Sequence, residues 1–341
     1  MNIAVLGLDT SNYRTSAALI DGKGRILLNY RELLPVPPGE RGLRPNEAVF
    51  AHLRLLSAAA GTLREAANGR SVAAVAASLS PRDGTDSYMP VFMAGASFGR
   101  LAAAALGVPF IGTTHQRGHL AAAKAGTELD RAENFLALHL SGGTTDLLEI
   151  RGESVRQIGG SLDLHAGQLV DRAGVAMGLP FPAGPELEAL AVRGRSEGRL
   201  GCSMGSGDLN CHFSGAESKV QRWLAEGKTS REDTAREIYD VLARTVARML
   251  CAGAEKTGLR QALVAGGVAS SPLFRELLLQ RLSTRRGAPR AVFGRPEMSG
   301  DNAVGVALIG LEKIRNGSDT DRGENENGGE NSGREGSVRG D

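Results

Sequence analysis

The sequence predicts an α/β protein built from two similar halves that enclose a cleft. A strand–turn–strand pattern at the N-terminus recurs in the middle of the chain, and each copy is followed by segments with helical apolar spacing. The length of 341 residues is enough for two domains of ordinary size. Apolar residues make up 41% of the chain, which is typical of a globular protein.

The first copy of the pattern begins at the N-terminus. Apolar runs predict strands at 2–8, 16–20 and 26–29. The polar residues 9–12 join the first two strands, and Asp-Gly-Lys-Gly at 21–24 is a hairpin signal. This segment is therefore expected to form three strands joined by two turns.

The second copy has strands at 135–140 and 146–150 around the turn 141–145, which reads Ser-Gly-Gly-Thr-Thr. A turn of this kind groups backbone N–H groups that can hold a phosphate. Two such hairpins favour a duplicated fold with a cleft between its halves. The alternative is two ordinary hairpins that are unrelated.

Apolar spacing also predicts the helices that follow the hairpins, at 49–68, 94–106, 234–254 and 272–282. Asp233 is the expected N-cap of the third. Before the fourth, a strand at 261–264 leads into Gly266 and Gly267. A Gly-Gly turn between strand and helix lets backbone approach a nucleotide, although many α/β proteins use it for packing alone.

The sharpest chemical feature is the pair His115 and His119, which follows a short strand predicted at 110–111. Four residues apart on a helix, the two imidazoles share one face and can bind one metal ion. Asp301, in a turn before an apolar helix, is the best candidate for a carboxylate ligand, and its alternative role is a helix N-cap. Gln116 stands where a zinc peptidase would have its glutamate base, which disfavours that mechanism.

The remaining histidines are isolated in the sequence, and we expect each to be a hydrogen-bonded structural residue. They are His52, His139, His165 and His212.

Composition limits the cellular setting. Residues 316–341 hold seven acidic residues and three arginines with almost no apolar side chains, which predicts a disordered acidic tail. The rest of the chain is mildly basic, which permits a nucleic-acid partner without requiring one. Three cysteines, none in a C-x-x-C pair, favour a reducing compartment, so we expect a cytoplasmic protein. No apolar run is long enough for a membrane span.

Several segments also follow one another in a specific order. They are LGLDTSNYRTSAALID, AGASFGRLAAAALGVPFIGTTHQRGHLAA, LSGGTTDLLEI, LDLHAGQLVDRAGVAMGLPFPAGPELEALA, CHFSGAESKV, LVAGGVASSPLFREL and SGDNAVGVALIG. In this order they resemble the tRNA threonylcarbamoyladenosine transferase family, formerly described as O-sialoglycoprotein endopeptidases. The resemblance covers residues 3–314 and implies a fold of the actin–hexokinase–Hsp70 type, ribonuclease H-like in each half, with a nucleotide cleft between halves at 1–133 and 134–315.

The resemblance implies transfer of a threonylcarbamoyl group from threonylcarbamoyl-AMP to adenosine in tRNA. It assigns one divalent metal, iron or zinc, to His115, His119 and Asp301. Two imidazoles and a carboxylate leave open positions at such a metal. The nucleotide ligand would be threonylcarbamoyl-AMP, ATP or AMP. The implied partners are tRNA and the other proteins of the family's transfer complex, with no membrane partner.

The resemblance also implies positions for the nucleotide. They are Ser141, Gly142, Gly143, Asp171, Gly184, Gly266, Gly267 and Ser271. The first three match the family's phosphate and substrate loop, the next two its ribose region, and the Gly-Gly pair its adenine contact. The final serine replaces the asparagine that follows Gly-Gly-Val in the family. The resemblance assigns no catalytic side chain beyond these contacts.

The chain departs from the family pattern within these motifs. The family's Glu-Thr-Ser-Cys-Asp-Glu-Thr is here Asp-Thr-Ser-Asn-Tyr-Arg-Thr at 9–15, so Arg14 reverses the charge of an acid and Tyr13 replaces another. Thr144 replaces the histidine of Gly-Gly-His-Thr. Further departures lie at Leu164, Gln168, Glu217 and Ser271. A site that exchanges acids for arginine still favours an anion.

The sequence is consistent with three functions. The first is the metal-dependent transferase just described. The second is a divergent paralogue that binds nucleotide and partner proteins as a scaffold or regulator without catalysis. The third is a metallopeptidase, which lacks a placed base because residue 116 is glutamine.

Overall fold

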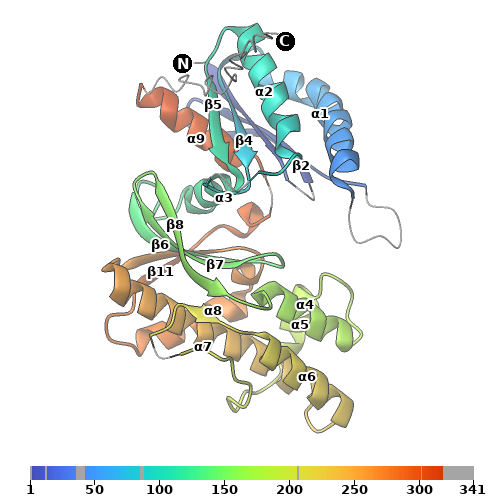
Figure 1. Ribbon diagram of the computed structural model, residues 1–341, viewed down its shortest axis with the longest axis vertical. Coiled ribbons are helices and arrows are strands. Elements are labelled where there is room, and N and C mark those ends of the chain that lie inside the picture. Colours follow the sequence, from blue (N-terminus) through green and yellow to red (C-terminus); the bar gives the residue numbers. More distant parts are fainter. Residues whose placement is uncertain are drawn as a thin grey trace, which may run out of the picture.

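The computed structural model describes residues 2–11, 14–35, 43–84, 88–205, 207–300 and 302–317. Asp301 and the part of the predicted tail beyond residue 317 lie outside the described residues. Within the described ranges the chain forms two lobes, each built around one β-sheet (Figure 1). None of the helices in these ranges has the combination of length and apolar character that a bilayer span requires.

Lobe 1 contains a five-stranded sheet in the order β3-β2-β1-β4-β5. Its strands are β1 (Ile3–Thr10), β2 (Arg14–Asp21), β3 (Ile26–Leu33), β4 (Ser71–Ser80) and β5 (Phe110–Thr114). The helices α1 (Pro45–Ala67) and α2 (Phe92–Leu106) cover one face, and α9 (Val304–Arg315) covers the other (Figure 1). Because both faces are covered, β1 and β2 are almost continuously buried rather than alternating.

Lobe 2 contains a six-stranded sheet in the order β11-β10-β6-β7-β8-β9. Its strands are β6 (Asn134–Leu140), β7 (Thr145–Arg151), β8 (Ser154–Ser161), β9 (Asn210–Cys211), β10 (Gln261–Ala265) and β11 (Arg290–Phe293). Its helices are α4 (Ala166–Ala176), α5 (Gly184–Ala191), α6 (Ser214–Glu226), α7 (Arg231–Thr257) and α8 (Pro272–Ser283).

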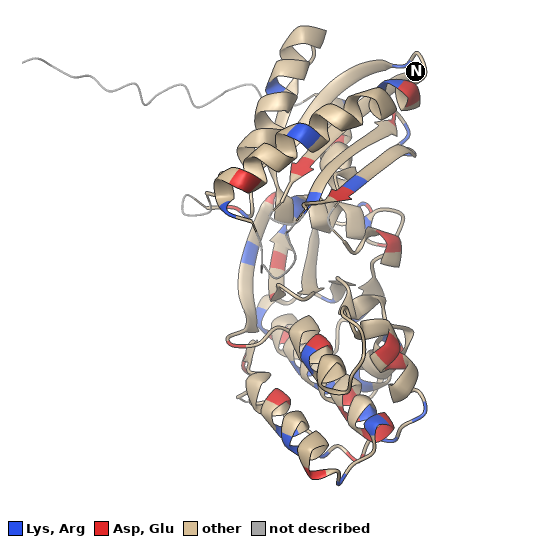
Figure 2. Cartoon of the chain, turned by 90° about the vertical axis from the view of Figure 1, so that its right-hand side faces the viewer, with Lys and Arg blue, Asp and Glu red and all other residues tan. Residues whose placement is uncertain are grey.

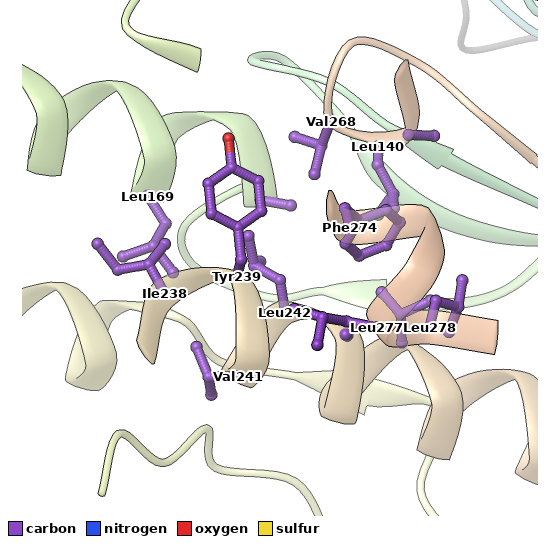
Figure 3. Close-up of a cluster of buried hydrophobic side chains, with 14 of the residues drawn as sticks. Leu140, Leu169, Ile238, Tyr239, Val241, Leu242, Val268, Phe274, Leu277 and Leu278 are labelled. Carbon is purple, nitrogen blue, oxygen red and sulfur yellow. The ribbon is translucent and has the colours of Figure 1, made fainter. Parts of the chain in front are cut away.

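The larger core of the protein lies on one face of the lobe 2 sheet. Tyr239 and Leu242 of α7 pack with Phe274 of α8 and with Leu140 of β6 (Figure 3). The opposite face receives α3 (His115–Lys124) from lobe 1, whose Ala123 belongs to a buried cluster with strand residues of lobe 2. The helix α3 therefore joins the two lobes.

The two sheets repeat one topology. In lobe 1, β1, β2 and β3 pair antiparallel, and β4 and β5 continue the sheet parallel to β1. In lobe 2, β6, β7 and β8 pair antiparallel, and β10 and β11 continue it parallel to β6. The predicted duplication of an α/β half is confirmed.

The last helix does not lie with the half that precedes it in the sequence. The predicted boundary at 133/134 coincides with the start of β6 at Asn134. The range 134–315, however, includes α9, which packs on β1, β2 and β4 of lobe 1. Gly7 lets the helix approach, since a Cβ there would lie 2.5 Å from the carbonyl oxygen of Ala303.

Two local predictions need correction. The helix α7 is capped by Ser230, whose hydroxyl accepts from the backbone N–H of Asp233, so Asp233 is the third residue of the helix and not its N-cap. The strand β4 was absent from the sequence prediction. Its alanine-rich sequence has weak intrinsic strand preference, and burial within the sheet determines its structure.

Charged side chains of both signs are interleaved on the helices of both lobes in the view of Figure 2. Several form ion pairs, such as Arg244 and Arg281 with the buried Asp240. The face shown in Figure 2 is therefore mixed in sign.

Candidate active site

The predicted histidine pair lies at the start of α3, directly after β5. Thr114 ends the strand and caps the helix by accepting from the backbone N–H of Arg117. This places His115 and His119 one turn apart on α3, with His115 against Asp9 and Phe92 of lobe 1 and His119 beside His139 of lobe 2. Their Nε2 atoms are 3.0 Å apart, so the two imidazoles converge on one point. The geometry predicted from their spacing is present.

A buried carboxylate holds the first of these histidines. Both oxygens of Asp9, at the end of β1, lie 2.9 and 3.0 Å from Nδ1 of His115, and the residue is 1% exposed. Because a carboxylate accepts, Nδ1 carries the hydrogen and Nε2 presents a lone pair. This is the carboxylate–histidine arrangement that orients metal ligands in proteins. The sequence placed Asp9 only in a turn.

A third imidazole lies beside the pair. The ring of His139, at the end of β6, is centred 5.1 Å from the ring of His119. Its Nδ1 is 3.2 Å from Oγ1 of Thr144, which in turn contacts Oγ of Ser141 at 2.8 Å. The expectation that His139 is hydrogen-bonded is met, but the residue belongs to the site and is not isolated. The packing of α3 on the lobe 2 sheet, which the sequence does not display, brings it there.

The two converging imidazoles fit a first-row metal ion. Nitrogen ligands at about 2.0–2.1 Å from a tetrahedral ion are separated by roughly 3.3 Å, close to the distance between these Nε2 atoms. Within the ranges that the structure describes, no three His, Cys, Asp or Glu residues are arranged to hold a metal. The predicted third ligand, Asp301, is outside those ranges and directly follows Gly300. The helix N-cap that was its alternative role belongs to Ala303.

A cleft of about 520 Å³ opens beside the histidines, and most of the predicted nucleotide positions line it. They are Ser141, Gly142, Asp171, Gly184, Gly267 and Ser271, together with His119. Gly266 instead lines a smaller adjacent pocket that also touches His119 and His139. Gly143 lies in the same exposed turn as Gly142. Segments far apart in the sequence therefore meet at one site.

Glycine is needed at the positions of this site for two different reasons. A Cβ on Gly266 would lie 2.2 Å from the carbonyl oxygen of Leu140, and its φ of +103° is strained for any other residue, so the fold itself needs this glycine. A Cβ on Gly267 or Gly142 would meet nothing within 4 Å. These two positions instead leave backbone open to the cleft, which suits the close approach of a ligand.

Three helices begin at the cleft. Gly167 in the first turn of α4, Gly184 at the start of α5, and Ser271 at the N-cap of α8 all line it. The Ser271 hydroxyl accepts from the N–H of Phe274 at 3.1 Å, so it caps the helix. Helix N-termini carry partial positive charge, which favours anions such as phosphate. In α4 the N–H groups of Ala166 and Gly167 already donate to Thr145 and Ser141, and in α8 that of Leu273 donates to Glu188.

Polar side chains complete the wall of the cleft. Asp171 accepts from the backbone N–H of Ala183 through Oδ1, and its other oxygen has no partner among the described residues. The Tyr239 hydroxyl donates to the carbonyl of Gly184 at 3.1 Å, and burial raises the pKa of Tyr239, so it remains a donor. Tyr239 and Glu188 line the cleft but were not predicted as site residues. Both lie on helices whose apolar spacing indicates core packing, so the sequence pattern does not mark them as residues of a cleft.

Comparison with known proteins agrees with this architecture. The sequence profile described as "TsaD: tRNA N6-adenosine threonylcarbamoyltransferase" matches residues 34–307. A protein of that name from Aromatoleum aromaticum is 32% identical over 317 residues, covering 90% of each chain. Another, from Granulibacter bethesdensis, is 30% identical and covers 92% of this chain and 89% of its own.

The similarity to solved structures shows the fold of this chain and no further property. The hexokinase of the ROK family from Thermus thermophilus has a TM-score of 0.52 at 19% identity and covers 92% of this chain and 99% of its own. HypF from T. kodakarensis has a TM-score of 0.57 at 14% identity, covering 93% of this chain and 48% of its own. The predicted fold of the actin–hexokinase type is confirmed. Taken with the sequence relatives, these findings show that the chain belongs to the tRNA N6-adenosine threonylcarbamoyltransferase family.

Proposed function

We propose that this chain transfers a threonylcarbamoyl group from threonylcarbamoyl-AMP to an adenosine of tRNA, with a divalent iron or zinc ion. The observation that carries the proposal is that one cleft is lined both by His119 and by glycines at helix N-termini. The histidine is a metal-type ligand, and the glycines leave backbone open to a nucleotide phosphate. We further propose that tRNA and the other proteins of the family's transfer complex are its partners.

The residues of lobe 2 bind and orient the adenylate in this proposal. The open backbone at Gly142 and the partial positive charge at the N-terminus of α4 favour the phosphate. The oxygen of Asp171 without a partner among the described residues accepts from the ribose hydroxyls. The bare backbone of Gly267 supports the adenine ring.

The residues of lobe 1 hold the metal. His115 and His119 would bind it through Nε2, and Asp301 would complete the set. When bound, the ion supplies a Lewis acid near the carbamoyl carbonyl and the phosphate oxygens. Asp9 keeps the His115 ring in the required tautomer through the hydrogen bond at Nδ1.

The reaction itself is an acyl transfer between two held groups. A bond forms between the exocyclic nitrogen of adenosine and the carbamoyl carbon, and the bond from that carbon to the phosphate oxygen breaks. AMP leaves with the electron pair, and the amine loses one proton. The cleft contributes by holding donor and acceptor at reacting distance and by binding the anionic leaving group.

One observation favours the second candidate, a paralogue that binds nucleotide without catalysis. Arg14 and Thr144 replace charged or basic residues of the family pattern at the two hairpins that face the cleft. Transfer activity separates the two functions, because both require the same fold and the same nucleotide cleft.

The test uses purified full-length chain, unmodified tRNA, the donor adenylate and the partner proteins of a related complex. We expect modified adenosine in the tRNA by mass spectrometry, and about one bound metal per chain by elemental analysis. His115→Ala with His119→Ala should abolish both while leaving the protein folded, at a lower unfolding temperature because buried Asp9 loses its partner. Arg54→Gln, at an exposed position of α1, is the matched control. Nucleotide binding without any transfer would instead support the paralogue.

A further inference from the structure

Arg14 has an unusual place at the edge of the cleft. It begins β2, which pairs antiparallel with the strand β1 that carries Asp9. Its Nη1 lies 3.4 Å from the point where a Cβ on Gly300 would be. Gly300 lines the 520 Å³ cleft and directly precedes the predicted ligand Asp301. The guanidinium therefore lies on the lobe 1 side of the cleft, next to the loop that would complete the metal site.

This guanidinium lacks the partners that Arg244 and Arg275, two other half-buried arginines, have. Among the described residues, no acceptor binds the Arg14 side chain, and its Nε is buried without a hydrogen bond. Arg244, by contrast, donates to Asp240 at 2.8 Å, and Arg275 donates to the carbonyls of Ala269 and Gly294. A buried donor without an acceptor is costly, so it persists where an absent group satisfies it.

The local structure keeps Arg14 in this place. Ser11 donates from its backbone N–H to the carbonyl of Arg14 at 3.1 Å, which fixes the backbone at the start of β2. The nearby carboxylate of Asp9 is directed to His115. A cation close to a predicted metal site favours an additional anion there, because it offsets the repulsion between the two positive charges.

We propose that Arg14 binds an oxyanion of the acyl donor, either the carboxylate of the amino-acid part or the phosphate. Arg14 is thus a specificity residue of this chain, at a position where the family pattern has an acid. The inference rests on the proposed function for the identity of the donor. The two oxyanions share their chemistry toward a guanidinium, which forms paired charge-assisted hydrogen bonds with either.

Two pairs of probes distinguish the sources, each differing in one anionic group. AMP and adenosine differ by the phosphate, and N-carbamoyl-L-threonine and its methyl ester differ by the charged carboxylate. Each is added to the metal-loaded full-length chain, and affinity is measured by calorimetry and by the shift in unfolding temperature. The variants are Arg14→Gln and Arg14→Leu, with Arg54→Gln on the outer helix α1 as the matched control.

We expect Arg14→Gln to weaken binding of the charged member of one pair by about 10- to 100-fold and to leave its neutral member unchanged. Without ligand, Arg14→Leu should unfold at the same temperature as the parent or a higher one, because it removes an unsatisfied cation. If both charged probes bind parent and Arg14→Gln equally, or if neither binds the parent better than its neutral counterpart, the assignment is wrong.

The outcome is independent of the transfer assay. Anion binding that depends on Arg14 in a chain that modifies no tRNA would retain this site and reject the proposed function. Transfer that is unaffected by Arg14→Gln, with unchanged anion affinity, would reject the site and retain the function.

Discussion

Asp9 and His115 are hydrogen-bonded across lobe 1, although 106 positions separate them in the chain. The contact joins the end of β1 to the first turn of α3. It directs Nε2 of His115 toward Nε2 of His119. The arrangement of the histidine pair therefore depends on the first hairpin as well as on helical spacing.

We predict that Asp9→Ala weakens metal affinity by about 10- to 100-fold, because the His115 ring loses the partner that fixes its tautomer. Affinity is measured by competition with a coloured chelator. Asp83→Asn, which removes an exposed partner of Arg117, serves as the control. Equal metal affinity in parent and Asp9→Ala would remove Asp9 from the site.

The glycines at 266 and 267 give a matched pair of variants. Gly266→Ala should destabilise the protein by about 2 kcal/mol or more, because its Cβ meets backbone and its φ is positive. Gly267→Ala should leave the unfolding temperature nearly unchanged and weaken binding of AMP, since the added methyl projects into open space. The opposite pattern would show that the cleft is not where the nucleotide binds.

Glu149 provides a pH-dependent prediction. Hydrogen bonds from Arg156 and then Arg151 hold the pKa of this buried carboxyl below its ordinary 4.5. Its stabilising effect is therefore complete above pH 4.5 and is lost as the pH falls through the lowered pKa of the folded state.

Glu149→Gln should then cost about 1 kcal/mol at neutral pH, a modest value because both arginines are largely exposed. The difference between parent and variant should shrink as the pH is lowered below 4.5, measured by urea unfolding over a pH series. A constant difference across the series would contradict the assignment.

Cys202 should be the most reactive thiol. Its hydrogen bond with the buried Cys211 thiol lowers the pKa of Cys202 to about 7, whereas burial raises the pKa of Cys251. Alkylation by iodoacetamide, followed by peptide mass spectrometry, should label Cys202 first, with a half-maximal rate near pH 7. Cys202→Ser should remove the fastest alkylation step. Equal labelling of all three cysteines would contradict this prediction.

Sequence reasoning found the parts of the site that local spacing encodes. His115 and His119 share a helix face, and Gly267 lies in the turn after a strand, so their roles follow from a few neighbouring residues. The residues that it missed depend on contacts between distant segments. Asp9, on β1, contacts His115 on α3, and His139 of lobe 2 lies beside His119.

The same difference between local patterns and long-range contacts applies to the fold. The two hairpins were visible because turn residues separate clear apolar runs. The position of α9 was not, because an apolar helix at the end of a chain gives no sign of which sheet it covers. Leu311 and Ala307 bury against Val5 of the first strand, and only the completed structure reveals this contact.

The return of α9 to lobe 1 also determines the order in which the protein can mature during synthesis. A chain emerging from the ribosome presents the first sheet early, yet one face of that sheet stays uncovered until residues 304–315 appear. Lobe 2 lies wholly between, so it can finish folding first. A nascent chain truncated before Val304 should consequently carry a folded second lobe and an incomplete first one, open to chaperones at β1 and β4.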